Sequence, residues 1–300
     1  MHGSPFQVMP RVKFTGAPMS FIQRTDRRLL ASALYVTLAI AGTVSTTLAA
    51  DAGLSGQPPE PPFDQERFNK EKPERNWSLI VGAGGIYEPE YEGSGDFKVQ
   101  PVPFVVFTYG EWLEIDPRGV TITAFEHNGF ALAAKVGYEG GRDEDDADRL
   151  RGLGDIDFAA TVGAKASYKW DGFEIYASVD QTIEGSESLI GTFGAEYQAP
   201  VSERLILGAG VEAVVANDKH MQSYFDVTAA QAAKSGLPEY KAEAGLKRVN
   251  VSASAIYLLS ENWLIRGEAG VGFLTGDAAD SPIVEEKTQP SASLFVGYKF

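Results

Sequence analysis

The chain has 300 residues, a formal net charge of −15, 32 glycines and no cysteine. This acidity argues against nucleic acid or an anionic membrane surface as a partner, because either would require a basic patch. The lack of cysteine excludes disulfides and thiolate chemistry.

The N-terminal region resembles an export signal. Arg24, Arg27 and Arg28 precede an apolar run, Leu29–Leu48, which is followed by small residues. A positive segment, an apolar segment and small residues before Ala50 are typical of a secretory signal peptide cleaved after Ala49. A transmembrane helix is the alternative, since about twenty apolar residues can span a bilayer. We predict a signal peptide with an upstream extension over residues 1–49.

Residues 50–76 are rich in proline and charge and show no apolar period. Such a segment cannot bury enough apolar surface to fold alone. We predict a periplasmic arm here, followed by a folded domain over residues 77–300.

The folded domain alternates apolar and polar residues along long segments. In one of them Phe173, Ile175 and Val179 face one way, while Glu174 and Asp180 face the other. This period of two is typical of strands. The predicted strands are Trp77–Tyr87, Phe97–Thr108, Glu111–Asp116, Gly119–Glu126, Phe130–Tyr138, Asp155–Trp170, Phe173–Glu184, Leu189–Ala199, Leu205–Val215, Leu246–Tyr257, Trp263–Thr275 and Pro290–Phe300.

A soluble β-sandwich also alternates, but its strands average about five or six residues, shorter than most of these. An all-β, closed antiparallel transmembrane barrel of twelve strands fits better, because such barrels have an even strand number. The weakest strands are Glu111–Asp116 and Gly119–Glu126, and merging them gives a ten-strand alternative. The last strand, Ser291–Phe300, should close the barrel against Trp77–Tyr87.

The connections between the predicted strands fall into two length classes. Tight turns at one rim alternate with long loops at the other, as short periplasmic turns and long extracellular loops do in outer-membrane barrels. The tight turns are 109–110, 127–128, 171–172, 200–203 and 259–261, and the long loops are 88–96, 139–154, 216–245 and 276–289.

Aromatic residues support this orientation. All four tryptophans fall at the short-turn ends of their strands, as an interfacial girdle would require. The predicted girdle is Trp77, Trp112, Trp170, Trp263, Tyr298 and Phe300.

The inward faces of the strands carry charges of both signs. These side chains could line a hydrated pore, or they could close the lumen by pairing with one another. The lumen-lining candidates are Lys135, Asp157, Lys165, Glu174, Asp180, Glu196, Arg204, Glu212, Arg248, Arg266 and Glu268, with Asp155, Lys169 and Glu184 on the same faces.

Nothing in the sequence predicts an enzyme, a cofactor or a metal centre. Asp218, His220 and Ser223 are the residue types of a hydrolase triad, but near-adjacent spacing is not triad geometry and no G-x-S-x-G occurs. The acidic loop Glu139–Arg151 could bind divalent cations with lipopolysaccharide phosphates, although a solvated charge run is the favoured interpretation.

Several stretches resemble the MipA/OmpV family of outer-membrane proteins, and the resemblance spans Trp77–Phe300. The matching stretches are Pro89–Ser94, Pro101–Pro103, Gly141–Asp143, Leu153–Ile156, Ser223–Phe225, Ser235–Leu237, Gly276–Val284 and Phe295–Phe300, of which Gly276–Val284 is the most specific.

The resemblance implies an integral protein of the Gram-negative outer membrane, in contact with lipid and lipopolysaccharide. It further implies a scaffold that brings a lytic transglycosylase together with a murein synthase. Other family members resemble osmotically responsive or solute-permeable barrels, so a small-solute channel is the alternative function. The expected contact surface for the enzymes is the arm together with the tight turns.

Overall fold

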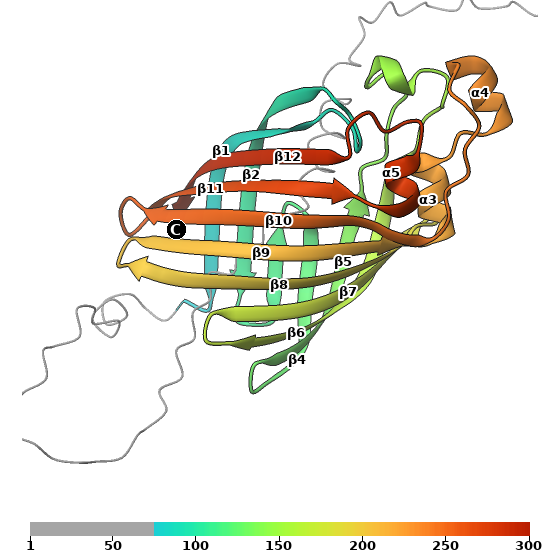
Figure 1. The fold of residues 1–300 in the computed structure, drawn as a ribbon. Coiled ribbons are helices and arrows are strands. Elements are labelled where there is room, and N and C mark those ends of the chain that lie inside the picture. The colour runs from blue at the N-terminus through green and yellow to red at the C-terminus, as the bar shows by residue number, and fades with distance from the viewer. Residues whose placement is uncertain (1–74) are drawn as a thin grey trace, which may run out of the picture.

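A computed structural model describes residues 75–300 as a closed antiparallel barrel of twelve strands, with loops and short helices gathered at one end (Figure 1). The predicted signal peptide and nearly all of the predicted arm lie outside the described residues. The strands are β1 (Trp77–Pro89), β2 (Phe97–Tyr109), β3 (Leu113–Asp116), β4 (Gly119–His127), β5 (Phe130–Glu139), β6 (Ala159–Trp170), β7 (Phe173–Ile183), β8 (Leu189–Ser202), β9 (Leu205–Ala216), β10 (Gly245–Leu258), β11 (Trp263–Leu274) and β12 (Thr288–Lys299).

The strand number confirms the twelve-strand prediction and rules out the ten-strand alternative, because β3 and β4 pair as separate strands. One predicted boundary is wrong by four residues: β6 begins at Ala159 rather than at Asp155. The residues before it belong to a loop, where Ile156 bridges back to Arg142. Apolar and polar residues continue to alternate through this loop, so the alternation alone could not locate the start of β6.

β12 closes the barrel against β1, with Gly82 opposite Gly297, as predicted. Its outward side chains are exposed, for example Leu294 at 60%, whereas Phe295 is only 7% exposed and faces inward. Exposed large apolar side chains recur on the strands around the wall, for example Val136, Phe193 and Val251. An apolar outer surface on a closed barrel is what contact with lipid requires.

The connections largely follow the predicted two rims, which we call the short-turn rim and the long-loop rim. Two short connections, Pro117–Arg118 and residues 184–188, nevertheless lie on the long-loop side, because they join an upward strand to a downward one. The long loops carry a 3₁₀ helix, η1 (Asp148–Leu150), and three α-helices, α3 (Asp218–Phe225), α4 (Ala229–Ser235) and α5 (Gly276–Asp280). None of the helices within residues 75–300 is long and apolar enough to cross a membrane.

The barrel interior has an apolar sector that the sequence did not predict. Ile86, Val102 and Phe295 form a buried cluster inside β1, β2 and β12, and Phe104 packs against it. The Phe104 ring occupies the space where a Cβ on Gly82 would lie, and the Phe295 ring does the same at Gly84. The glycines of β1 therefore make room for large inward aromatic rings, so this side of the lumen is filled.

A second apolar cluster fills the interior near the short-turn rim. Ile80, Val106, Ile256 and Leu264 are buried together there. Both faces of β1 and β2 are thus apolar over most of their length, and the polar inner residues Glu88, Lys98 and Gln100 lie near the long-loop rim.

Candidate functional site

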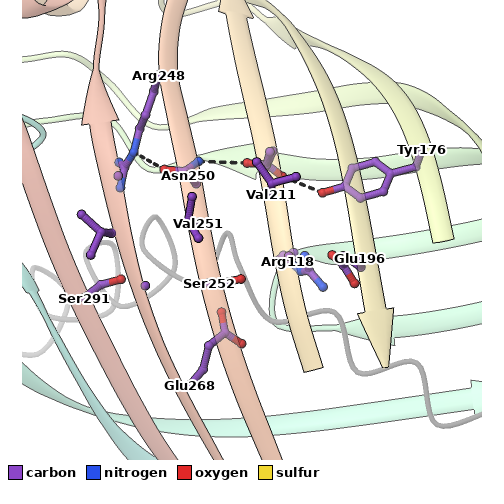
Figure 2. A pocket seen from close by; sticks show the side chains of 15 residues that line it. Arg118, Tyr176, Glu196, Val211, Arg248, Asn250, Val251, Ser252, Glu268 and Ser291 are labelled. Atoms are coloured by element: carbon purple, nitrogen blue, oxygen red, sulfur yellow. Dashed lines mark hydrogen bonds between the residues drawn. The ribbon is translucent and has the colours of Figure 1, made fainter. Parts of the chain in front are cut away.

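The lumen holds a small polar cavity of about 60 Å³, lined by residues from β7 round to β12. The Glu212 carboxylate is part of the lining and accepts hydrogen bonds from the Tyr176 hydroxyl at 2.7 Å and from Asn250 Nδ2 at 3.1 Å. Figure 2 shows Tyr176 and Asn250 on either side of this contact. Arg248 Nε in turn donates to Asn250 Oδ1. The lining also includes Arg118, Glu196, Ser252 and Glu268.

Oppositely charged lumen residues pair with one another. Lys135 Nζ lies 2.8 Å from Asp180 Oδ2, and Lys165 Nζ lies 2.7 Å from Glu174 Oε1. Arg266 Nη2 lies 2.9 Å from Glu268 Oε2. Pairing in the wall leaves less uncompensated charge for selecting a passing ion.

Most predicted lumen residues do face the interior. Each of them lines the cavity or pairs with a side chain of opposite charge. Lys169 also belongs to this group, because its Nζ lies 3.5 Å from Glu174 Oε2. The inward-facing candidates are Lys135, Lys165, Glu174, Asp180, Glu196, Glu212, Arg248, Arg266 and Glu268.

Two of the predicted lumen residues, Asp157 and Arg204, are misplaced. Asp157 is exposed in the loop before β6, together with Asp155, whose Oδ1 accepts the backbone N–H of Glu144. Arg204 is exposed in the turn between β8 and β9, where its N–H donates to Ser202 Oγ. Glu184, from the same inward faces, is in a turn with φ of 68°. In each case the residue that alternation assigned to the lumen lies just outside the strand, before its start or after its end.

The sequence did not identify Arg118 as a lumen residue. Asp116 Oδ1 accepts the N–H groups of Arg118 and Gly119, and Asp116 Oδ2 accepts Arg118 Nε at 3.0 Å. The Asp-Pro-Arg-Gly sequence is a strong turn signal. That signal predicts the turn but not its position beside the cavity.

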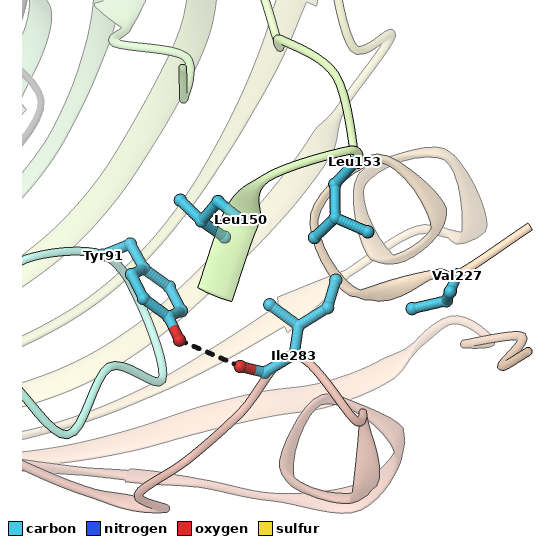
Figure 3. Close-up of a cluster of buried hydrophobic side chains, with 5 residues drawn as sticks. All are labelled: Tyr91, Leu150, Leu153, Val227 and Ile283. Atoms are coloured by element: carbon cyan, nitrogen blue, oxygen red, sulfur yellow. Dashed lines mark hydrogen bonds between the residues drawn. The ribbon is translucent and has the colours of Figure 1, made fainter. Parts of the chain in front are cut away.

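The long loops pack together into one body across the long-loop rim, which we call the cap (residues 90–96, 140–158, 217–244 and 275–287). Tyr91, Leu150, Leu153, Val227 and Ile283 are buried against one another, and the Tyr91 hydroxyl donates to the Ile283 carbonyl at 3.0 Å (Figure 3). These five residues come from all four loops. Since β6 lies six strands away from β12 in a closed order of twelve, contacts between their loops cross the mouth of the barrel.

A buried polar cluster anchors the cap to the barrel wall. His220 of α3 is 4% exposed, and its Nδ1 lies 2.9 Å from Ser188 Oγ and 3.2 Å from Glu139 Oε1. Its Nε2 lies 3.0 Å from Lys247 Nζ, which also pairs with Glu92 at 3.1 Å. The cluster therefore joins three loops to the ends of β5 and β10.

Burial and nearby charges shift the pKa values of His220 and Glu92 in this cluster. Burial, together with the Lys247 ammonium, lowers the pKa of His220, which favours the neutral imidazole. Burial would raise the pKa of Glu92, but Lys247 and Arg248 outweigh it and lower that pKa to about 2. Glu92 is therefore ionised at neutral pH.

This cluster does not have the geometry of a hydrolase. In a triad the serine and the carboxylate occupy different imidazole nitrogens, whereas here Ser188 and Glu139 share Nδ1. Ser188 is also 0% exposed. In the Asp218–His220–Ser223 set, Asp218 Oδ1 accepts the backbone N–H of Ala244.

The acidic loop uses its carboxylates locally. Glu144 Oε2 accepts the backbone N–H groups of Gly152 and Gly154, and Asp146 accepts that of Asp143. Among residues 75–300, no group of three or more histidines and carboxylates is placed to hold a metal ion.

The predicted girdle residues all lie at the short-turn rim. Trp77, Trp112, Trp170 and Trp263 are exposed there. Tyr298 bridges two girdle rings, with centroids 5.1 Å from Trp263 and 4.8 Å from Phe300. Their position at a membrane interface stays a prediction.

Comparisons with known proteins identify a family. A family model described as MltA-interacting protein MipA matches residues 81–300. No curated protein matches the chain.

Among solved structures, OmpT of Vibrio cholerae aligns at 10% identity and a TM-score of 0.33, covering 75% of this chain and 97% of that one. OmpF of Salmonella typhi, solved with daunomycin, aligns at 11% identity and 0.35, covering 75% and 97%. The N-terminal barrel domain of Pseudomonas aeruginosa OprF aligns at 12% identity and 0.24, covering 75% and 98%. At TM-scores this low, these structures support no inference about the detailed architecture of this barrel.

Proposed function

Because the chain belongs to the MipA family of MltA-interacting proteins, we propose that this outer-membrane barrel is a non-enzymatic scaffold for peptidoglycan-remodelling enzymes. The protein is integral to the Gram-negative outer membrane, where its apolar outer wall meets lipid. Its partners in this role are a lytic transglycosylase and a murein synthase.

The cap across the mouth is the observation that favours a scaffold over a porin. Loops from opposite sides of the barrel are packed together there, and charges in the lumen are paired. An open channel requires neither feature. The short-turn rim then remains as the surface that faces the periplasm.

Exposed carboxylates follow that rim. Each of the five tight turns has one in the turn or beside it, and we call them the acidic ring: Glu111, Glu126, Asp171, Glu203 and Glu261. Although Arg204 and Lys169 are also exposed at this rim, five exposed carboxylates around it attract a partner surface of the opposite sign and speed its association. A basic patch on the enzyme would therefore suit this rim.

The experiment is capture of a soluble lytic transglycosylase by the immobilised barrel. We expect the full chain to capture the enzyme, and a chain beginning at Arg75 to lose most of that capture if the arm contributes. The Glu111→Lys/Glu203→Lys/Glu261→Lys variant should capture about tenfold less, because it reverses charges that steer association.

Glu187→Lys, which changes an exposed carboxylate on the long-loop side, is the matched control and should capture normally. Absence of capture by the full chain would overturn the proposed function. Normal capture by both the truncated and the charge-reversed chains would overturn the assigned surface.

A small-solute channel is the second candidate. The polar cavity of about 60 Å³ is the observation that favours it, since polar side chains already line a space within the lumen. Conductance across a planar bilayer separates this function from the scaffold.

A further inference from the structure

One strand of the barrel wall lacks a partner along most of one edge. β2 pairs with β1 at every position from Phe97 to Tyr109. On its other side β3 pairs only with residues 107–109. Within residues 75–300, no strand pairs with Phe97–Val106 on the side facing away from β1.

The gap beside this edge has defined borders. Below it is the turn Pro117–Arg118, because β3 ends at Asp116 and β4 begins at Gly119. Across from β2 is the end of β5, where Gly119 pairs with Gly137 and the Tyr138 hydroxyl donates to the Pro117 carbonyl at 2.6 Å. We call this gap in strand pairing the portal; it lies in the half of the wall nearer the long-loop rim.

Two prolines keep the β2 edge from pairing. The N–H of Gly110 donates to the carbonyl of Asn76, so even-numbered N–H groups of β2 point to β1. Successive residues of a strand alternate in this direction, so the nitrogens of Pro101 and Pro103 point into the portal. Proline has no N–H to donate, and natural sheets use it to blunt edges against strand addition. The occupant of the portal is therefore not another strand.

At the portal, the outer face of β2 is apolar, and the inner face is apolar from Val102 onward, with Lys98 and Gln100 nearer the long-loop rim. Val99 is 72% exposed and Val105 50% exposed on the outer face. On the inner face, Val102 and Phe104 belong to the apolar sector. An apolar surface thus runs from the lipid side, past the blunted edge, to the inside of the barrel.

Backbone carbonyls of the same edge have no strand to pair with among the described residues. Lipid-exposed backbone is tolerated only where water or another polar group reaches it. An occupant that combines a hydrocarbon chain with a polar head satisfies both requirements. The blunted edge and the continuous apolar surface suit the chain, and the carbonyls, which accept hydrogen bonds, suit a head with hydroxyl or ammonium donors.

From these features we infer that the portal is a lateral binding site for the acyl chain of a lipid from the outer leaflet. The chain lies between the outer wall and the apolar sector, and the polar head remains at the carbonyls of the β2 edge. This site is independent of the scaffold role, because it opens to the membrane rather than to the periplasm.

Quenching by brominated lipid tests the portal directly. The natural chain contains no cysteine, so a single introduced cysteine can carry a small fluorophore. Gln100→Cys places it on the inner face of β2 beside the portal. Ser252→Cys places it on the inner face of β10, which pairs on both sides. Val99→Cys is the lipid-facing reference.

The full chain is reconstituted in vesicles that contain phosphatidylethanolamine, whose ammonium group can donate to carbonyls, with bromine midway along its acyl chains. We expect quenching at position 100 to be more than about twice that at position 252, and to approach that at position 99, because only the portal admits acyl chains past the wall. Lys98→Cys provides a second inner position if Gln100→Cys does not fold.

Equal quenching at positions 100 and 252 would overturn the inference. So would a quantitative disulfide-linked dimer of Val99→Cys that Val251→Cys does not form, because a second copy would then cover the portal.

Discussion

Glu92 and His220 show how a few buried residues can hold a cap over a barrel. Glu92 faces two cations, Lys247 at 3.1 Å and Arg248 at 3.6 Å. His220 stacks on Tyr224 with ring centroids 4.6 Å apart and faces Glu139, Ser188 and Lys247. The sequence singled out His220 because Asp218 and Ser223 lie close to it along the chain, but these are not the residues whose polar groups its ring contacts. Its true partners come from β5, β10 and the β7–β8 turn, and no local spacing could reveal them.

Acid should loosen the cap in two steps. His220 has a lowered pKa in the closed cap, so below about pH 6.5 the open state binds a proton that the closed state does not, and closure is weakened. Glu92, with a pKa lowered to about 2, stabilises the closed cap at neutral pH, and this contribution is lost as pH falls from about 4.5 toward 2.

Hydrogen exchange of α3, corrected for intrinsic pH dependence, measures the first step. Protection should fall between pH 7 and pH 5 in the natural chain and should not change with pH in His220→Gln. The idea fails if protection is constant in the natural chain, or falls equally in the variant.

At the scale of elements, alternation was sufficient where a strand has lipid on one side and polar groups on the other. β7 is the clearest case, with Val179 exposed and Asp180 paired to Lys135. Alternation was insufficient in β1 and β2, where both faces are apolar, so the inner apolar sector was missed. It also overran the ends of β6 and β7, because turn residues there continue the pattern by chance.

The register of β7 can be tested by two neighbouring substitutions. Val179→Arg should destabilise the barrel by about 2–4 kcal/mol if the side chain meets the middle of the membrane. Asp180→Asn breaks only a part-exposed ion pair and should cost less than about 1 kcal/mol. Urea unfolding in vesicles gives both values, and the opposite ranking would mean that the register is shifted by one residue.

At the scale of the whole molecule, the cap could not have been predicted from the sequence. It exists because closure of the barrel brings the β5–β6 loop opposite the β11–β12 loop, and sequence distance hides that geometry. Most stretches that carry the MipA/OmpV resemblance meet here. Tyr91, Leu153, Phe225 and Ile283 all belong to them and are buried in the cap. Those stretches therefore have a structural reason to recur together.

The central claim is that this barrel is a capped scaffold rather than an open channel. Conductance of the purified full chain in a planar bilayer tests that claim most directly. The cap and the paired lumen charges predict a silent membrane at neutral pH, with the same protein shown to be folded and inserted. Stepwise conductance through single barrels under those conditions would contradict the account.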